Sequence, residues 1–289
     1  LENIGLEPKM ESSTFKEVNT ISINCKKSVL VRAWDYDQVE AKYPGNKECH
    51  FNLDSNVLDI EAKSYLIVSV PKNIQFVIER IYGNLETVGE LGKILVENVS
   101  GNCSIQSAES LTIENVSGNC KLGCITTNAN IRNVGGNLNF VVENGVLSIN
   151  GVGGNLSGKA NHISLSTSVG GNLKIMTNRF DGRENQLRAG GSIKLNISDL
   201  ENTVINAKAG GIASINYQDG SEKFTNGKFE KKFGNGEQVV QLKAGGNIKI
   251  SDEEADFEVN HNFGSADDVY VDEIERKFET RALQSSGFD

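Results

Sequence analysis

The stretch CSIQSAESLTIENVSGN, from Cys103 to Asn119, predicts the fold of a large part of the chain. Apolar residues alternate with polar ones along it, at Ile105, Leu111, Ile113 and Val116. A period of two is typical of strands that bury one face. The stretch ends in a Gly-Asn pair, and both residue types favour turns. Each such unit is therefore expected to hold at least two short strands separated by small or polar corners.

The same corner, Gly-Asn followed by an apolar residue or Cys, recurs along the chain. Corner glycines from Gly83 to Gly171 are 18, 17, 18, 18 and 17 residues apart. The steps lengthen to 20 residues at Gly191 and Gly211, and the corner returns at Gly246 after a gap of 35. These units are too short for a helix pair and carry no helical stripe. The expected fold class is all-β, a parallel β-solenoid (β-helix), expected to be right-handed, with turns of about 18 residues.

The corner residues are the candidate structural site. A sharp turn often needs a positive φ, which Gly and Asn tolerate best. Equivalent Asn side chains stacked about 4.8 Å apart can also hydrogen-bond from one turn to the next. We therefore expect a structural turn ladder in preference to a glycan or metal site. Its expected members are Gly83, Asn84, Gly101, Asn102, Gly118, Asn119, Gly136, Asn137, Gly154, Asn155, Gly171, Asn172, Gly246 and Asn247.

Three regions are expected from the presence or absence of the repeat pattern along the sequence. Residues 1–80 predict an N-terminal β cap, or irregular first turns, that covers an open strand edge. Residues 81–262 hold the repeats, with a charged excursion at 219–237 that we expect to protrude as a loop or hairpin. Residues 263–289 form a helical tail.

The tail predicts a short C-terminal helix. Ser265 to Asp268 is typical of a helix N-terminus with acidic first-turn residues, and Val271, Ile274 and Phe278 would share one face. We expect this helix to cap the far end of the repeats. Docking to a partner is the alternative.

Composition argues against several classes of function. The net charge of -9, from 38 acidic and 29 basic residues, argues against nucleic acid as a partner. No stretch reaches the roughly 18 apolar residues of a transmembrane segment. The first twenty residues lack the apolar core of a signal peptide, and the chain starts at Leu1, so we expect a processed or truncated N-terminus. Both cytoplasm and cell envelope stay open as locations.

No cofactor or metal site is expected from the cysteines and histidines. Most of the cysteines are expected to be buried core residues. Cys103 and Cys120 share one repeat position and would stack, with a disulfide as the alternative. The chain's other cysteines are Cys25, Cys49 and Cys124, and its three histidines, expected as isolated surface residues, are His50, His162 and His261.

A catalytic site is not expected either. Carboxylates in the irregular segments could form an acid and base pair, but their spacing is also that of solvated surface. These are Asp181, Glu184, Asp199 and Glu201. The acidic run at Asp252, Glu253, Glu254 and Asp256 lacks the order of a calcium loop and is expected to be surface.

Several phrases of the sequence resemble a bacterial adhesin-like family of β-solenoids whose function is uncharacterised. They run in order from Phe15 to Ile250: VRAWD at 31–35, VE at 39–40, VSVP at 68–71, and the V-x-G-N-L corners through AGG at 189–191 and 244–246. The corners are also similar to those of bactofilins, which are polymer-forming cytoskeletal β-helices. The long N-terminal region and the excursion depart from the bactofilin pattern. The resemblance implies adhesion by shape alone and carries no site residues.

The sequence as a whole favours a non-catalytic structural or adhesin-like protein. It would act as an assembly scaffold or a protein-binding module, through self-association or another protein. The alternative is a polysaccharide-binding or polysaccharide-cleaving β-helix protein.

Overall fold

The computed structural model describes residues 9–45, 47–182, 184–225, 227–252 and 268–286. The chain divides into two compact units, each described by itself below. The first unit comprises Leu1–Glu109 and Asn262–Asp289, and the second comprises Ser110–His261.

The first unit is built from the N-terminal strands and the helix α1 (Asp268–Ser286). Its strands are β1 (Met10–Lys16), β2 (Thr20–Cys25), β3 (Val29–Trp34), β4 (Gln38–Pro44), β5 (Cys49–Asp54), β6 (Val57–Ala62), β7 (Leu66–Pro71), β8 (Gln75–Ile81), β9 (Leu85–Val99) and the start of β10 (Cys103–Val116).

The second unit begins within β10 and contains the later strands. They are β11 (Cys120–Ile125), β12 (Ala129–Val134), β13 (Leu138–Val152), β14 (Leu156–Ile163), β15 (Ser166–Val169), β16 (Leu173–Phe180), β17 (Glu184–Ala189), β18 (Ile193–Ile197), β19 (Thr203–Ala209), β20 (Ala213–Tyr217), β21 (Gly220–Phe224), β22 (Lys228–Lys232), β23 (Gln238–Ala244) and β24 (Ile248–Ser251).

The structure corrects the predicted fold class. The described residues are all-β apart from one helix, as expected. The parallel β-solenoid is wrong: the strands form a closed barrel of six parallel strands with further strands outside it. Outer strands also pair antiparallel, as β5 does with β6 and β22 with β19. Alternation and corner spacing specify which side chains face inward, but they do not specify which strands become neighbours.

Strand order in the first unit departs from chain order. Strand β2 lies between β6 and β8, and β3 lies between β7 and β9, all in parallel register. Strands β5 and β4 then cover β6 and β7 in antiparallel register, and β1 covers β4. The first strands are therefore inserted between later ones.

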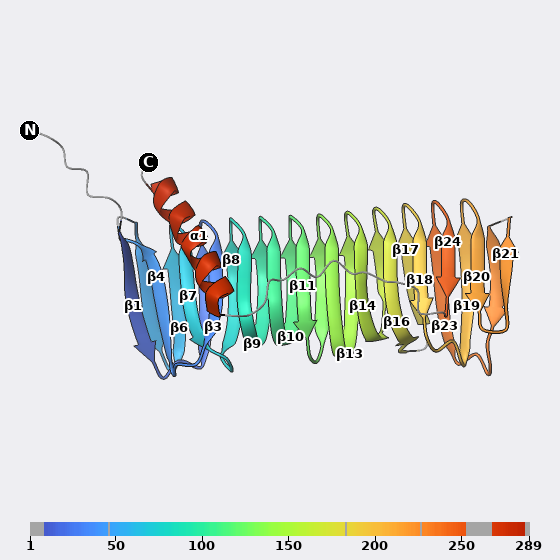
Figure 1. Cartoon of the computed structure of the whole chain (residues 1–289), viewed down its shortest axis with the longest axis horizontal. Helices are drawn as coiled ribbons and strands as arrows, with labels where there is room; N and C mark the ends of the chain where they lie inside the picture. Colours follow the sequence, from blue (N-terminus) through green and yellow to red (C-terminus); the bar gives the residue numbers. More distant parts are fainter. Residues whose placement is uncertain (1–8, 46, 183, 226, 253–267, 287–289) are drawn as a thin grey trace, which may run out of the picture. The chain divides into compact units, whose positions relative to one another are not determined.

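In the second unit, too, strands are inserted between others that are not their neighbours in the sequence (Figure 1). Strand β23 lies between β17 and β19, and β24 lies between β18 and β20. The excursion at 219–237 does not protrude as predicted: it contains β21 and β22, which pair antiparallel with β20 and β19. The chain thus skips one position, covers the outer strands, and returns to fill the position it skipped.

The alternating apolar residues form the core as predicted. Ile105, Leu111, Ile113 and Val116 are all buried, and the largest fully buried side chains include Phe76, Phe140 and Phe180. Three cysteines are buried core residues, Cys25, Cys103 and Cys120, and all five are free thiols. Burial raises the pKa of the Cys25 thiol to about 12, against a smaller lowering by the Lys27 backbone, which makes it a poor nucleophile.

Helix α1 belongs to the first unit, where it contacts β3 and β4. The expectation that it caps the far end of the repeats is therefore wrong. Phe278 packs with Leu30 and Ile67 and meets the ring of Tyr65 edge-on, with 5.6 Å between ring centroids. Residues 265–267, and the side chains of Val271 and Ile274, lie outside the described residues.

One buried carboxylate ties α1 to the strands. Glu275 is ion-paired with Arg32 on β3 and accepts a hydrogen bond from Nζ of Lys42 on β4 at 2.5 Å. Burial alone would raise the pKa of Glu275, but the hydrogen bonds and charges of Lys42 and Arg32 outweigh it and hold the pKa below its usual value.

Candidate binding furrow

The corner residues are joined by side-chain to backbone hydrogen bonds. In the second unit, Oδ1 of Asn119 accepts from the backbone N–H of Asn137 at 2.8 Å. Oδ1 of Asn137 accepts in turn from Asn155 at 2.7 Å, and Asn155 from Asn172 at 2.8 Å. In the first unit, Asn84 accepts from Asn102 at 2.8 Å.

The ladder continues through the inserted strands of the second unit. Asn172 accepts from the N–H of Ser192 at 2.8 Å, and the Ser192 hydroxyl oxygen accepts from the N–H of Asn247 at 3.1 Å. Asn247 accepts from the N–H of Ile212 at 2.8 Å. We propose that this ladder has the structural role expected of it, because it satisfies the backbone donors of successive corners.

The corner glycines are needed for space, and the positive φ suggested by the sequence is the wrong reason. The positive-φ glycines among the described residues are elsewhere, for example at Gly89 and Gly182. A Cβ on Gly154 would lie 2.5 Å from Oδ1 of Asn137 and 2.9 Å from the backbone of Gly136. Only a residue without Cβ lets each Asn side chain reach the next corner.

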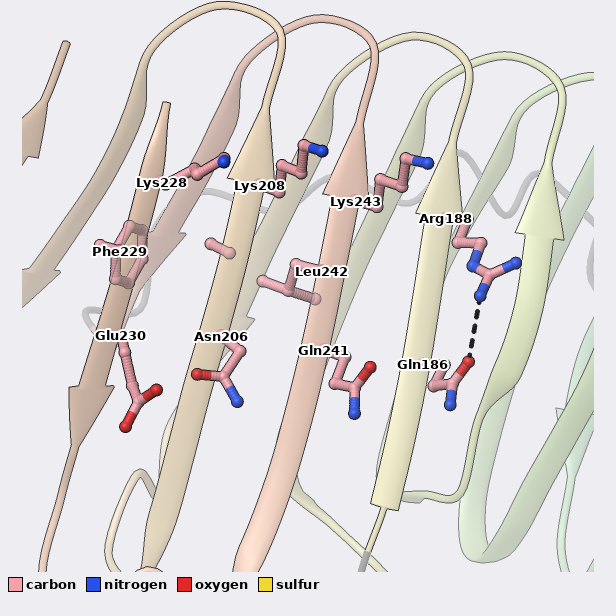
Figure 2. Close-up of a pocket in the computed structure, with 11 residues that line it drawn as sticks. Gln186, Arg188, Asn206, Lys208, Lys228, Phe229, Glu230, Gln241, Leu242 and Lys243 are labelled. Atoms are coloured by element: carbon pink, nitrogen blue, oxygen red, sulfur yellow. Dashed lines mark hydrogen bonds between the residues drawn. The ribbon is translucent and has the colours of Figure 1, made fainter. Parts of the chain in front are cut away.

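The surface of the second unit has a furrow of about 530 Å³ that crosses four neighbouring strands. The strands lie in the order β17, β23, β19 and β22. Figure 2 shows two rows of side chains along the furrow, one on each side.

The first row, here called the cationic row, contains one basic residue from each strand. Arg188 is in register with Lys243, Lys243 with Lys208, and Lys208 with Lys228. All four are exposed. A smaller hollow of about 350 Å³ continues from Arg188 and Lys243 toward Gly190 and Gly245.

The second row, here called the amide row, is mostly neutral. Gln186 is in register with Gln241, and Gln241 with Asn206, while Glu230 occupies the outermost position on β22. Leu242, Ala207 and Phe229 lie between the two rows, and their side chains are buried (Figure 2). The furrow thus has one basic wall, one amide wall and a floor of strand backbone.

Two basic side chains of the furrow, those of Lys208 and Lys243, are available to a ligand. Among the described residues, no carboxylate forms an ion pair with Lys208 or Lys243. Arg188 contacts Oε1 of Gln186 at 3.5 Å, which is at the limit of a hydrogen bond. The cationic row therefore places positive charge along the furrow. At Lys208 and Lys243 no carboxylate of the described residues neutralises that charge.

The carboxylates considered for catalysis have local partners or lie exposed. Oδ1 of Asp199 accepts from the N–H of Glu201 at 2.9 Å, so it stabilises its own turn. Glu184 is exposed at the start of β17. Asp181 lies 3.3 Å from Nδ1 of His162 and 3.5 Å from Nε of Arg179.

The His162 contact corrects the expectation that every histidine is isolated. His162 also accepts from Nε of Arg179 at 3.2 Å, so it belongs to a surface cluster with Asp181. His50 is exposed and lies 3.8 Å from Glu48. His261, like Glu253, Glu254 and Asp256, lies outside the described residues.

The part of the chain that the structure describes holds no group of three or more His, Cys, Asp or Glu able to bind a metal ion. Within that part, α1 is not apolar enough to cross a bilayer. Oδ2 of Asp252 accepts from the N–H of Gln218 at 2.8 Å and so contributes to a turn.

The furrow was missed at the level of sequence, although a signal for it exists. Arg188, Lys208 and Lys243 each precede an Ala-Gly-Gly triplet, at 189–191, 209–211 and 244–246. A basic residue at one fixed position of three repeats predicts a row of charge if those repeats are neighbours. The order of the row does not follow from the sequence, because the triplet at 244–246 comes 35 residues after the one at 209–211 along the chain.

Comparison with known proteins gives no family assignment. No family model and no curated protein matches the chain. A solved structure described as a "putative adhesin" from Bacteroides fragilis matches 86% of this chain and 99% of its own, with 13% identity and a TM-score of 0.37. One from Parabacteroides merdae matches 85% and 97%, with 12% identity and a TM-score of 0.35.

A third such structure, from Parabacteroides distasonis, matches 84% of this chain and 98% of its own, with 15% identity and a TM-score of 0.30. All three carry the adhesin description, and none is described as a bactofilin, so the similarity to bactofilins is not shown. Similarity at this level establishes neither a shared fold nor a shared function. The function is therefore inferred from the chain's own residues.

Proposed function

We propose that the chain is a non-catalytic binding protein of the adhesin type, which holds an extended partner along the furrow of the second unit. The observation that carries this proposal is the furrow itself. All four strands present a basic side chain in register, and β17, β23 and β19 also present an amide, so the same pair of contacts recurs on three neighbouring strands. A repeating surface suits a ligand that also repeats, because each unit of the ligand can make the same contacts.

Binding is favoured over cleavage by the chemistry of the furrow. Hydrolysis of a glycosidic bond generally needs two carboxyl groups on either side of it, about 5–10 Å apart. Among the residues that line the furrow, Glu230 alone carries a carboxylate, and it stands at the outer edge. The polysaccharide alternative is therefore proposed in its binding form.

Self-association through open strand edges has less support. The outermost strands carry several charged residues, as in GSEKF for β21 and KFEKK for β22. Charged side chains on edge strands discourage pairing with another copy. We therefore propose a different molecule as the partner.

A hydrogen-exchange experiment tests the proposal. The full chain is incubated with a panel of soluble polysaccharides of both neutral and acidic composition, and exchange is compared with that of the free chain. The proposal predicts protection in β17, β23, β19 and β22, with no new reducing ends in the polysaccharide. Protection confined to other strands, or the appearance of reducing ends, would contradict it.

An obstructing substitution gives a second test that does not depend on ligand charge. Gln241→Trp places a bulky side chain in the furrow, whereas Asn139→Trp alters an outward position of β13 outside it. We expect loss of binding with Gln241→Trp alone. Equal binding by the two variants would place the site elsewhere.

A further inference from the structure

We infer that the furrow binds an acidic polysaccharide, in which carboxylate or sulfate groups recur along an extended chain. This inference rests on the proposed function, because it names the ligand class of the same site. It starts from the in-register cationic row formed by Arg188, Lys243, Lys208 and Lys228 (Figure 2).

The spacing of the cationic row is the first step. Neighbouring strands lie about 4.8 Å apart, so a ligand that runs across the strands meets a new basic residue at each one. Like charges at this separation repel each other, and anionic groups placed between them remove that repulsion. The row is therefore better matched by several linked anions than by a single one.

The absence of internal partners is the second step. Among the residues that the structure describes, neither Lys208 nor Lys243 has a carboxylate in ion-pair contact. Elsewhere on the second unit, a basic residue does take such a partner: Lys231 is ion-paired with Glu222. The furrow differs because its opposite wall is made of amides, apart from Glu230 at the outer edge.

The amide row is the third step and distinguishes a polysaccharide from other polyanions. Gln186, Gln241 and Asn206 offer both donors and acceptors, which suits the hydroxyl groups of sugars. Single-stranded nucleic acid is usually held by stacking on exposed aromatic rings. The aromatic residue of the furrow lining, Phe229, is only 9% exposed.

The binding experiment uses the full chain and four soluble probes. They are heparin-derived oligosaccharides, which are sulfated, oligogalacturonates, which are carboxylated, neutral dextran oligosaccharides, and single-stranded DNA. Affinity is measured by calorimetry at several salt concentrations. We expect the two acidic oligosaccharides to bind, with affinity that rises with their length and falls as salt increases.

Matched charge variants locate the contact. The furrow variant is Arg188→Gln with Lys208→Gln and Lys243→Gln. The control, Lys174→Gln with Lys194→Gln and Lys249→Gln, removes the same charge from another in-register row, on β16, β18 and β24. Three exposed ion pairs together imply a loss of about tenfold for the furrow variant, and the control should bind nearly as the parent does.

A charge-preserving variant guards against misfolding of the furrow variant. Lys208→Arg with Lys243→Arg keeps the charge and should retain the affinity for acidic oligosaccharides. Loss of binding in this variant, with its thermal unfolding unchanged, would contradict the inference that charge is what the ligand recognises.

The remaining outcomes separate this inference from the proposed function. If dextran binds as tightly as the acidic probes and Gln241→Trp abolishes that binding, the furrow is a binding site but the ligand class is wrong. If single-stranded DNA binds more tightly than every oligosaccharide, the inference is overturned in favour of nucleic acid. Equal losses in the two charge variants would mean that only overall charge matters, which also overturns it.

Discussion

Lys243 lies beside Arg188 on neighbouring parallel strands, although the chain passes through Lys208 and Lys228 before it reaches Lys243. Strand β23 fills the position between β17 and β19, and its lysine completes the cationic row. The furrow therefore depends on the order of the strands as much as on their residues.

Paired cysteine substitutions test this strand order. Arg188→Cys with Lys243→Cys should form a disulfide on mild oxidation, because neighbouring strands place the two Cα atoms about 4.8 Å apart, within the range that a disulfide spans. Arg188→Cys with Lys208→Cys should stay reduced, because β23 separates the two strands and doubles the distance. Peptide mass analysis identifies the bond against the five native thiols, and a bond in the second pair alone would contradict the insertion of β23.

The corner ladder predicts a stability cost at Asn137. Asn137→Ala removes the acceptor for the N–H of Asn155, and one such hydrogen bond contributes about 1 kcal/mol. Asn139→Ala is the control, because within the described residues the Asn139 side chain makes no hydrogen bond. Urea denaturation should show a lower midpoint for Asn137→Ala than for Asn139→Ala. Equal midpoints would mean that the ladder contributes nothing measurable.

The steric account of the corners predicts a difference between two glycines. Gly154→Ala brings a Cβ within 2.5 Å of Oδ1 of Asn137, so the corner must shift, at a cost of about 1–3 kcal/mol. A Cβ on Gly151 has its nearest neighbour at 3.6 Å, which is ordinary contact. Gly151→Ala should therefore unfold near the parent's midpoint, and Gly154→Ala well below it. A Gly154→Ala variant as stable as the parent would refute the requirement for space.

Helix α1 should detach in acid because Glu275 holds it. The pKa of Glu275 in the folded chain lies below the ordinary value of 4.5, so its contacts stabilise the docked helix fully above about pH 4.5. That contribution is lost as the pH falls through the lower folded-state pKa. Hydrogen exchange in residues 275–284 should accelerate over this interval. Unchanged protection there would contradict the role of Glu275.

A substitution at neutral pH tests the same contact. Glu275→Gln removes the charge that pairs with Arg32 and Lys42 and should destabilise helix docking by about 1–3 kcal/mol. Glu279→Gln is the control, because Glu279 is 30% exposed and lies 4.0 Å from Lys42. Comparable exchange of α1 in the two variants would mean that Glu275 is not the main anchor.

The local features of the fold follow from the sequence, and the long-range order does not. Alternation correctly placed residues such as Ile105 and Ile113 in the core, because burial requires only that side chains alternate. The triplets after Arg188, Lys208 and Lys243 are identical, so any two of these repeats could pair in register. Which pair does so is decided by the antiparallel cover that β21 and β22 provide and by the position left for β23. The sequence predicts a loop for the excursion at 219–237, because its many charged residues obscure the alternation of apolar and polar residues that indicates a strand.

The central claim is that the furrow binds an acidic polysaccharide through the cationic row. The measurement that tests it most directly is calorimetric titration of the parent chain, the Arg188→Gln, Lys208→Gln, Lys243→Gln variant and the Lys174→Gln, Lys194→Gln, Lys249→Gln control with the same oligogalacturonate. We predict saturable binding to the parent and the control, and binding about tenfold weaker to the furrow variant. Equal affinity of all three proteins, or no binding to the parent, would contradict the claim.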